Sequence, residues 1–333
     1  MSKEESRSSA LSSILAEQYK VKDEKLIKAI VALGEASAGI TFLLRNYTSH
    51  TYAGTQNQSG DDQLDLDIDC DNAVFKAIRE AGVFSIAASE ETPVETDVSS
   101  SAGGGGGETE AVFSLGFDPL DGSSIIDANF SVGSIFGIWP GKGVLGRTGR
   151  EQVASAVTLY GPRTTLCIAL PSASTALGKD AVLEVTLTES ETTWEVSRDA
   201  IEIKASGKVF APGNLRASND NEQYNALIQH WISERYTLRY TGGMVPDVYH
   251  IFAKSKGVFT NVSSEKAKAK LRLLYEVAPM GLIVECAGGL TTHEAHDGSV
   301  LDEKIDDLDR RLGVCFGSSE EVQKYKSFMF ADK

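Results

Sequence analysis

Apolar residues recur at helical spacing in two stretches of the N-terminal third of the chain. In residues 24–45 they fall at Leu26, Ile27, Ile30, Val31, Leu33, Ile40, Leu43 and Leu44. In residues 62–81 they fall at Leu64, Ile68, Val74, Phe75 and Ile78. Spacing of three and four places apolar side chains on one helix face, so both stretches are predicted to be core-facing helices.

The middle of the chain carries strand patterns instead. Residues 84–88 form a short apolar run, and residues 113–117 and 130–139 alternate between large and small side chains, with another apolar strand at 161–170. Helical patterns return at 221–234 and 246–254, and a third such helix begins at Pro279 and ends at Gly288-Gly289. Because strands and helices mix without strict alternation or a repeat, a layered α/β fold is favoured over a barrel.

The length of 333 residues suggests two domains. Residues 172–205 are polar, acidic and less regular, so the junction is expected near Asp199. The two predicted domains are therefore residues 1–200 and 201–333.

Composition excludes several classes of protein. A net charge of −15 argues against binding to nucleic acid or to an anionic membrane, because both require a positive field. No run of about 18 apolar residues is present, so no membrane span is expected. The four cysteines, Cys70, Cys167, Cys286 and Cys315, lack zinc-site spacing, and the acidic N-terminus resembles no leader peptide. A cytoplasmic location is expected.

The most informative segment follows the predicted strand at 113–117. Asp118 and Asp121 lie three residues apart with a proline between them, which allows both carboxylates and the Leu120 carbonyl to face one site. Such hard oxygen ligands suit Mg²⁺ or Mn²⁺ and not zinc. After Gly122, the amides and hydroxyls of Ser123 and Ser124 suit a phosphate. An ordinary Asp-Gly turn with a serine cap is the alternative interpretation.

Other charged residues extend this picture. Glu90 and Glu91 directly follow the strand at 84–88. A separate acidic run between residues 61 and 71 places Asp67 and Asp71 on one helix face, where like charges repel. Solvated strand and helix ends explain these acids equally well. Gly242-Gly243 precedes a helix that could bind an anion, whereas Lys270 and Arg272 are individually typical of surface cations.

Two further patterns are set aside. The run of five glycines at 103–107 lacks the Gly-Lys-Ser/Thr of a phosphate-binding loop and is interpreted as a flexible hairpin tip. His293-Glu294-Ala295-His296 is one residue short of the H-E-x-x-H zinc motif and is interpreted as a surface turn.

Residues 117–139 resemble the signature of the fructose-1,6-bisphosphatase family of Mg²⁺-dependent sugar phosphatases, and the resemblance extends from about residue 26 to 317. Residues 210–217, 236–248 and 269–279 resemble the branch that acts on sedoheptulose 1,7-bisphosphate. The resemblance implies a layered α-β-α-β-α sandwich. It also implies a metal-binding catalytic domain followed by a substrate-binding domain.

The resemblance assigns roles to individual residues. It implies that two or three Mg²⁺ ions, or Mn²⁺, are held by Asp61, Glu90, Asp118, the Leu120 carbonyl, Asp121 and Glu276. It implies that Asp67 and Glu91 ready the attacking water. Gly122, Ser123 and Ser124 would hold the 1-phosphate. The sugar and its distal phosphate would be bound by Asn214, Arg239, Tyr240, Gly243, Met244 and Lys270. Thr260 replaces the tyrosine that the fructose enzymes place against that phosphate.

The expected activity is hydrolysis of the 1-phosphate of sedoheptulose 1,7-bisphosphate by a homodimer or homotetramer. Net charge does not oppose this small-molecule sugar bisphosphate, because a substrate meets a local site that bound cations make positive. A fructose-1,6-bisphosphatase or an enzyme of dual specificity is the first alternative. A non-catalytic sugar-phosphate sensor and an acidic scaffold are the others.

Overall fold

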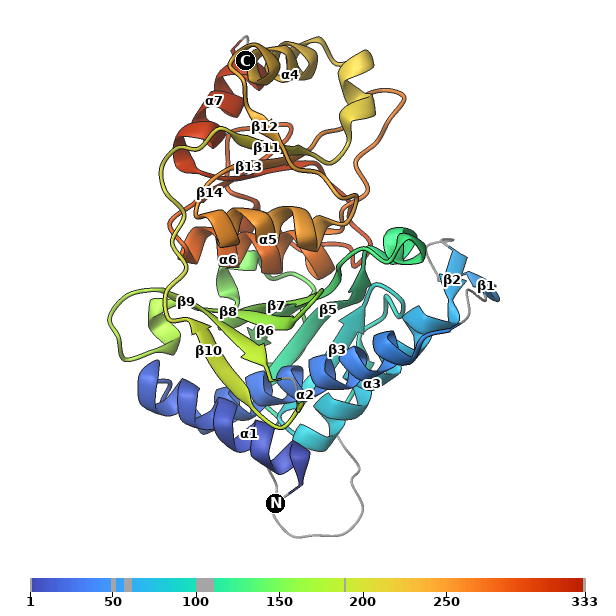
Figure 1. The fold of residues 1–333 in the computed structure, drawn as a ribbon, viewed down its shortest axis with the longest axis vertical. Helices are drawn as coiled ribbons and strands as arrows, with labels where there is room; N and C mark the ends of the chain where they lie inside the picture. The colour runs from blue at the N-terminus through green and yellow to red at the C-terminus, as the bar shows by residue number, and fades with distance from the viewer. Residues whose placement is uncertain (1, 49–51, 57–61, 100–110, 189, 332–333) are drawn as a thin grey trace.

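The computed structural model describes residues 2–48, 52–56, 62–99, 111–188 and 190–331. Its elements form five layers, in which helices and sheets alternate from the N-terminal end of the molecule to the C-terminal end (Figure 1). The layered α-β-α-β-α fold predicted from the sequence is therefore confirmed.

The larger sheet has eight strands in the order β10-β9-β8-β7-β6-β5-β3-β4. All neighbouring pairs are antiparallel except β3 and β5, which run parallel. The strands are β3 (Phe84–Ser89), β4 (Thr96–Asp97), β5 (Phe113–Asp121), β6 (Val132–Pro140), β7 (Ala154–Tyr160), β8 (Thr164–Leu170), β9 (Ala181–Leu187) and β10 (Trp194–Arg198). A separate hairpin pairs β1 (Tyr52–Gln56) with β2 (Asp62–Leu64).

Helices cover the outer face of this sheet (Figure 1). They are α1 (Lys3–Ser13) with the π-helical turn η1 (Ile14–Gln18), α2 (Glu24–Asn46) and α3 (Asp65–Ala81). By length and composition alone α2 is apolar enough to cross a membrane, but most of that stretch is buried. Its residues Ile30 and Leu33 are fully buried in the same apolar cluster as Phe117 and Phe136 of the sheet, so α2 is a core helix.

The smaller sheet has the order β12-β11-β13-β15-β14. Its strands are β11 (Val209–Pro212), β12 (Thr237–Leu238), β13 (Val258–Asn261), β14 (Leu290–His293) and β15 (Val314–Gly317). Between the two sheets lie α5 (Met244–Lys254) and α6 (Ala278–Cys286), whereas α4 (Glu222–Ser233) and α7 (Ser319–Met329) cover the far face (Figure 1). Short helical turns are η2 (Ser123–Ala128), η3 (Gly149–Glu151), η4 (Ser172–Ser174), η5 (Leu215–Asn219), η6 (Leu273–Val277) and η7 (Val300–Asp302).

Most of the sequence-predicted elements are confirmed. The helix predicted at 24–45 is α2, and those predicted at 221–234 and 246–254 are α4 and α5. Two predictions were wrong in detail. Residues 62–64 form β2 and not the first turn of a helix, and the region 172–205 contains the regular strands β9 and β10. The glycine run 103–107 lies outside the described residues.

One close approach fixes the central helix on the larger sheet. A Cβ atom on Gly133 of β6 would lie 2.3 Å from Val245 Cγ1 in the first turn of α5 and 2.6 Å from the Thr158 carbonyl oxygen. No side chain fits at this distance, so glycine at this position lets the start of α5 rest directly on the sheet.

We predict that Gly133→Ala lowers the free energy of unfolding by about 1–3 kcal/mol, because the added methyl group meets both a side chain and the backbone. Gly39→Ala is the matched control, since a Cβ there has no neighbour within 4 Å and Gly39 lies inside α2. The control is expected to raise stability by roughly 0.5–1 kcal/mol. Urea unfolding measures both changes, and equal behaviour of the two variants would contradict the close packing.

Candidate active site and metal centre

Parallel pairing of β3 and β5 brings the first two acidic residues together. Ser89 is the register partner of Phe117, so the residues that follow, Glu90 and Asp118, emerge side by side at the same sheet edge. The Glu90 N–H also donates to the Phe117 carbonyl at 3.1 Å, which extends this pairing by one step. The proximity of Glu90 and Asp118 is therefore a consequence of parallel register.

A bulge brings Asp121 to the same place. Asp118 pairs with Ile135 and Asp121 with Gly133, so three steps along β5 match two along β6. In a regular strand, positions three apart face opposite sides of the sheet. The extra residue in the Pro119-Leu120 segment removes this difference and re-aims a side chain, as bulges near functional sites commonly do.

The first turn of α5 holds the Asp121 carboxylate. The Met244 N–H donates to Oδ1 at 3.2 Å and the Val245 N–H donates to Oδ2 at 2.7 Å. Gly122 then turns the chain away with φ = 90°, a left-handed conformation that suits glycine. A Cβ on Gly122 would lie 3.6 Å from the Gly243 Cα, so the Asp121-Gly122-Ser123 segment and the start of α5 are in contact.

Glu276 enters from the other half of the chain, on the π-helical turn η6. It is buried, and its Oε2 accepts the Arg272 backbone N–H at 2.6 Å. One oxygen from each of Glu90, Asp118 and Glu276 lies within 4.8 Å of the others. Residues predicted as metal ligands from both halves of the chain thus converge on one point.

Burial and mutual repulsion determine the protonation of these acids. Desolvation first, and then the neighbouring carboxylates, raise the pKa values of Asp118 and Glu276 well above their ordinary range. Desolvation also raises the pKa of Asp121 to about 6, although the two N–H groups of α5 oppose this. A divalent cation among these oxygen donors would compensate the repulsion, so the site fits a hard metal ion.

Arg272 supplies positive charge to the same cluster. Its side chain is only 4% exposed, forms an ion pair with Glu90, and donates through Nε to Asp309 Oδ1 at 2.7 Å. The sequence does not indicate Arg272 as part of the site, because nothing in the pattern separates a buried arginine from a surface one. The structure shows that it orients Glu90.

The predicted water-activating residues lie on neighbouring segments. Asp67 is buried in the first turn of α3, and Glu91 follows β3 and is half-buried. One helical turn after Asp67, Asp71 accepts the Thr92 hydroxyl at 3.1 Å, and desolvation raises its pKa to about 6. Asp71 was noticed in the sequence only as a repelling partner of Asp67, yet it holds the segment that carries Glu90 and Glu91.

The residues predicted for the sugar and distal phosphate fall into two groups. Gly243 and Met244 form the start of α5, beside Gly122. Arg239 and Lys270 are exposed, and Tyr240 is 48% exposed with its hydroxyl donating to the Gly213 carbonyl at 3.1 Å. Asp247, not predicted, accepts the Thr241 N–H at 2.7 Å and shapes the loop between these groups.

Asn214 and Thr260 are both buried and hydrogen-bonded within the smaller domain. Asn214 is buried, and its amide group donates to the carbonyls of Val262 and Ala267 at 2.9 and 3.0 Å. Its N–H donors therefore hold the chain after β13, and in this conformation neither is available to a phosphate. Thr260 is fully buried and shares a hydrogen bond with the Tyr224 hydroxyl at 2.9 Å.

The remaining predicted residues are Ser123, Ser124, Leu120 and Asp61. Ser123 is half-buried and Ser124 is exposed in η2, directly after Gly122, and the Leu120 backbone lies inside the bulge of β5. Asp61 lies outside the described residues. The roles assigned to the individual residues stay predictions.

Comparison with known proteins gives the chain a family. The fructose-1-6-bisphosphatase N-terminal and C-terminal domain families match residues 14–188 and 203–330. The chain is 45% identical over 310 residues to a chloroplastic sedoheptulose-1,7-bisphosphatase of Triticum aestivum. This alignment covers 92% of this chain and 74% of that protein. It is 33% identical to a class 1 fructose-1,6-bisphosphatase of Pelobacter propionicus, over 92% of this chain and 88% of that one.

A solved structure resembles the whole chain. The crystal structure of a candidate sedoheptulose-1,7 bisphosphatase from Toxoplasma gondii superposes with a TM-score of 0.86 at 36% identity, covering 97% of this chain and 99% of that one. The sequence and structure comparisons therefore agree on the same family.

The buried carboxylates predict how stability depends on pH when metal is absent. Burial raises the pKa of Asp121 to about 6 in the folded protein, and it raises the pKa values of Asp118 and Glu276 well above their ordinary values. Acids with raised folded-state pKa values stabilise the protein fully below the unfolded-state pKa, about 4, and lose this contribution as pH rises through the folded value. The melting temperature in EDTA is therefore expected to fall between pH 5 and 7.

Added divalent metal is expected to reverse this trend, because it binds the deprotonated carboxylates. Asp118→Asn provides the control, since an amide does not titrate and the pH slope in EDTA should become shallower. A metal-free melting temperature that rises steadily from pH 5 to 7 would show that these acids are not protonated together in the folded protein.

Proposed function

The chain belongs to the fructose-1,6-bisphosphatase family of metal-dependent sugar-bisphosphate phosphatases, and we propose that it hydrolyses the 1-phosphate of sedoheptulose 1,7-bisphosphate. The choice of substrate rests on sequence identity. The chain is 45% identical to a sedoheptulose enzyme and 33% identical to a fructose enzyme, each over 92% of the chain. The products would be sedoheptulose 7-phosphate and inorganic phosphate.

We propose Mg²⁺ as the resident metal, with two or three ions per subunit and Mn²⁺ as a substitute. Support comes from the all-oxygen donor set of Glu90, Asp118 and Glu276, whose oxygens lie within 4.8 Å of one another. Asp121 and the Leu120 carbonyl would add further oxygens of the same kind. Hard cations prefer such ligands, whereas zinc prefers sites with nitrogen or sulfur.

The bound metal would lower the pKa of a water molecule and neutralise the phosphate. Asp67 and Glu91 would accept the proton that the attacking water loses, since Glu91 directly follows the ligand Glu90 and Asp67 is buried in the first turn of α3. Gly122, Ser123 and Ser124 would hold the reacting end of the substrate, and Lys270 with Arg239 would bind the far phosphate. Binding energy from that remote group would orient the reacting bond.

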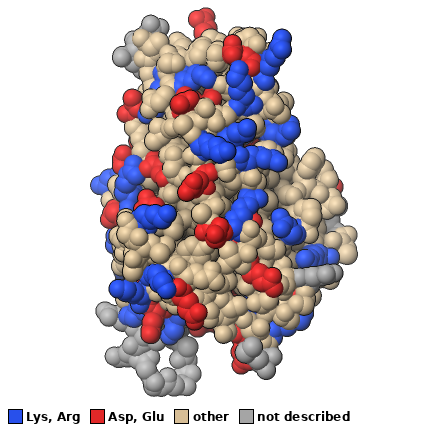
Figure 2. All heavy atoms as spheres, turned by 60° about the vertical axis from the view of Figure 1, so that its left-hand side comes forward, with Lys and Arg blue, Asp and Glu red and all other residues tan. Residues whose placement is uncertain are grey.

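The net charge of −15 is compatible with this anionic substrate. Figure 2 shows acidic and basic side chains interspersed on one face of the molecule, with lysines and arginines more frequent on its upper, C-terminal part. Asp118, Asp121 and Glu276 are instead buried at the metal centre, where they would be compensated by cations. The local field at the site, and not the total charge, determines whether a phosphate is attracted.

We also propose that the protein forms a homodimer or homotetramer. Apolar side chains near Arg239 are about half exposed, namely Leu215, Leu238 and Tyr240. Exposed apolar groups next to a residue predicted to bind substrate suit a subunit interface that completes the site. Light scattering of the purified protein measures this directly. The cytoplasmic location stays a prediction.

Removing one buried ligand tests the reaction. Asp118→Asn should lower kcat for Mg²⁺-dependent phosphate release by at least about 100-fold, because metal ions contribute several kcal/mol to the transition state. Asp69→Asn is the matched control, since Asp69 is exposed on α3 and outside the cluster. Unchanged activity in Asp118→Asn would refute the site. Metal binding without phosphate release by the native chain would instead indicate a sensor.

Substrate preference is measured by kcat/KM for the two bisphosphates in saturating Mg²⁺. We expect the seven-carbon substrate to be favoured by about 10-fold or more, the size of effect that one additional carbon unit in a shaped pocket commonly gives. Equal values would indicate dual specificity. A preference of the same size for fructose 1,6-bisphosphate would overturn the proposed substrate and leave the reaction type intact.

A further inference from the structure

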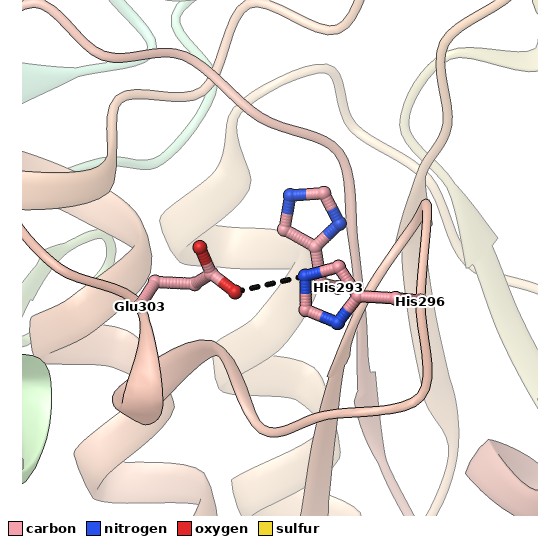
Figure 3. A group of neighbouring side chains, drawn as sticks. All are labelled: His293, His296 and Glu303. Atoms are coloured by element: carbon pink, nitrogen blue, oxygen red, sulfur yellow. Dashed lines mark ion pairs between the residues drawn. The ribbon is translucent and has the colours of Figure 1, made fainter.

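A second group of metal-binding side chains lies outside the carboxylate cluster, around the end of β14. His293 is the last residue of β14, His296 lies in the turn that follows, and Glu303 follows η7. One ligand atom from each of the three residues lies within 4.8 Å of the others. Figure 3 shows both rings turning a nitrogen to the side on which the Glu303 carboxylate lies.

The surrounding contacts bring these three side chains together. The two imidazole rings stack with centroids 4.5 Å apart and planes 6° from parallel. Glu303 is 12% exposed, and its Oε2 accepts from Arg310 at 2.5 Å while its Oε1 lies 3.0 Å from His296 Nε2. Arg310 thus fixes one carboxylate oxygen and leaves the other facing the rings, an arrangement that resembles outer-shell support of a metal ligand.

The chemistry of this group differs from that of the active site. Two imidazoles and one carboxylate form a mixed nitrogen and oxygen ligand set, which favours borderline transition metals such as Zn²⁺ over Mg²⁺. Desolvation lowers the pKa of His293 below its ordinary value, so this ring is neutral and able to bind a cation at neutral pH. His296 is 54% exposed, which leaves room for water as a fourth ligand.

We propose that His293, His296 and Glu303 form a binding site for a divalent transition-metal cation of the Zn²⁺ type, separate from the Mg²⁺ centre. Zinc bonds of about 2.0–2.1 Å require ligand atoms closer together than 4.8 Å. A cation lies in the plane of each imidazole ring that binds it, so the exposed His296 ring must rotate out of its parallel stack on His293 for both rings to bind one ion. The proposal does not depend on the substrate or on the proposed reaction.

Cation binding has one necessary local consequence. His293 Nδ1 accepts the Ala295 backbone N–H at 2.9 Å. Because Nδ1 accepts, the neutral ring carries its proton on Nε2. A cation bound to Nδ1 would use the lone pair that accepts the Ala295 N–H. A cation bound to Nε2 would displace the ring proton to Nδ1. In either case Nδ1 stops accepting, so the Ala295 amide must lose this hydrogen bond. The neighbouring residue Glu294 accepts the N–H groups of Ser263 and Gly313 and ties the turn to the chain that leads to Lys270.

Calorimetric titration with Zn²⁺ in saturating Mg²⁺ tests the site. Zn²⁺ binding at the carboxylate cluster is common to all variants, so the comparison isolates the histidine site. The native protein should bind one more Zn²⁺ ion than His296→Gln and His293→Gln, or bind it at least about 100-fold more tightly. Asp297→Asn is the matched control, because Asp297 lies in the same turn, is 69% exposed and pairs with Lys326. It should bind Zn²⁺ as the native protein does.

Amide NMR provides a second readout in the folded native protein. The Ala295 resonance should shift on addition of one equivalent of Zn²⁺ and stay in place in His296→Gln. Both histidine variants should retain native Mg²⁺-dependent phosphate release, which shows that they fold. Identical Zn²⁺ binding by the native protein and both histidine variants would overturn the proposal, as would equal loss of Zn²⁺ binding in Asp297→Asn.

Discussion

The burial of several carboxylates at one point is the constraint on which the rest of the architecture depends. Glu90, Asp118 and Glu276 place oxygens within 4.8 Å of one another in a largely dry interior, where like charges repel strongly. The fold reduces this cost with Arg272, with the first N–H groups of α5 and with backbone donors to Asp118 and Glu276. These compensations are partial, because the pKa values remain raised. A bound cation would compensate the remaining repulsion. The buried carboxylates that destabilise the metal-free fold are therefore also the source of its affinity for metal.

This constraint also explains why the helical layer between the two sheets is packed so tightly. The first turn of α5 must reach Asp121, and it does so because Gly133 of β6 leaves no side chain in the way. From the same layer, η6 brings Glu276 against the end of β5. The metal centre is therefore built jointly by the larger sheet and by the central helices, although the two family domains meet in sequence only between residues 188 and 203. A site of this kind cannot form in either half alone.

The sequence predicted those parts of the site that depend on local order along the chain. Glu90 and the Asp118–Ser124 segment follow apolar strands, and strand ends are visible as a change in pattern. The buried strand β9 and the edge strand β10 are not indicated by the sequence, because both are short elements inside a stretch that is polar and acidic on average. The sequence could not show the partners of Arg272 and Asn214, because these partners lie far away along the chain. Arg272 pairs with Glu90 and Asp309. Asn214 donates to the carbonyls of Val262 and Ala267. No local pattern encodes such partners.

The same division between layers bears on how the length of a substrate is selected. The reacting phosphate is assigned to Gly122 and Ser123 on the larger sheet, whereas Arg239, Tyr240 and Lys270 belong to segments that flank the smaller one. The two phosphates of a bisphosphate would thus be bound by different layers. The helix α5 packs against both sheets and sets the distance between these layers. Thr260 is enclosed in the smaller sheet and bonded to Tyr224, so it adds no side chain to the far end. If the two phosphates are bound by different layers, the choice between six and seven carbons would depend on the spacing of these layers as well as on the side chains at the far end.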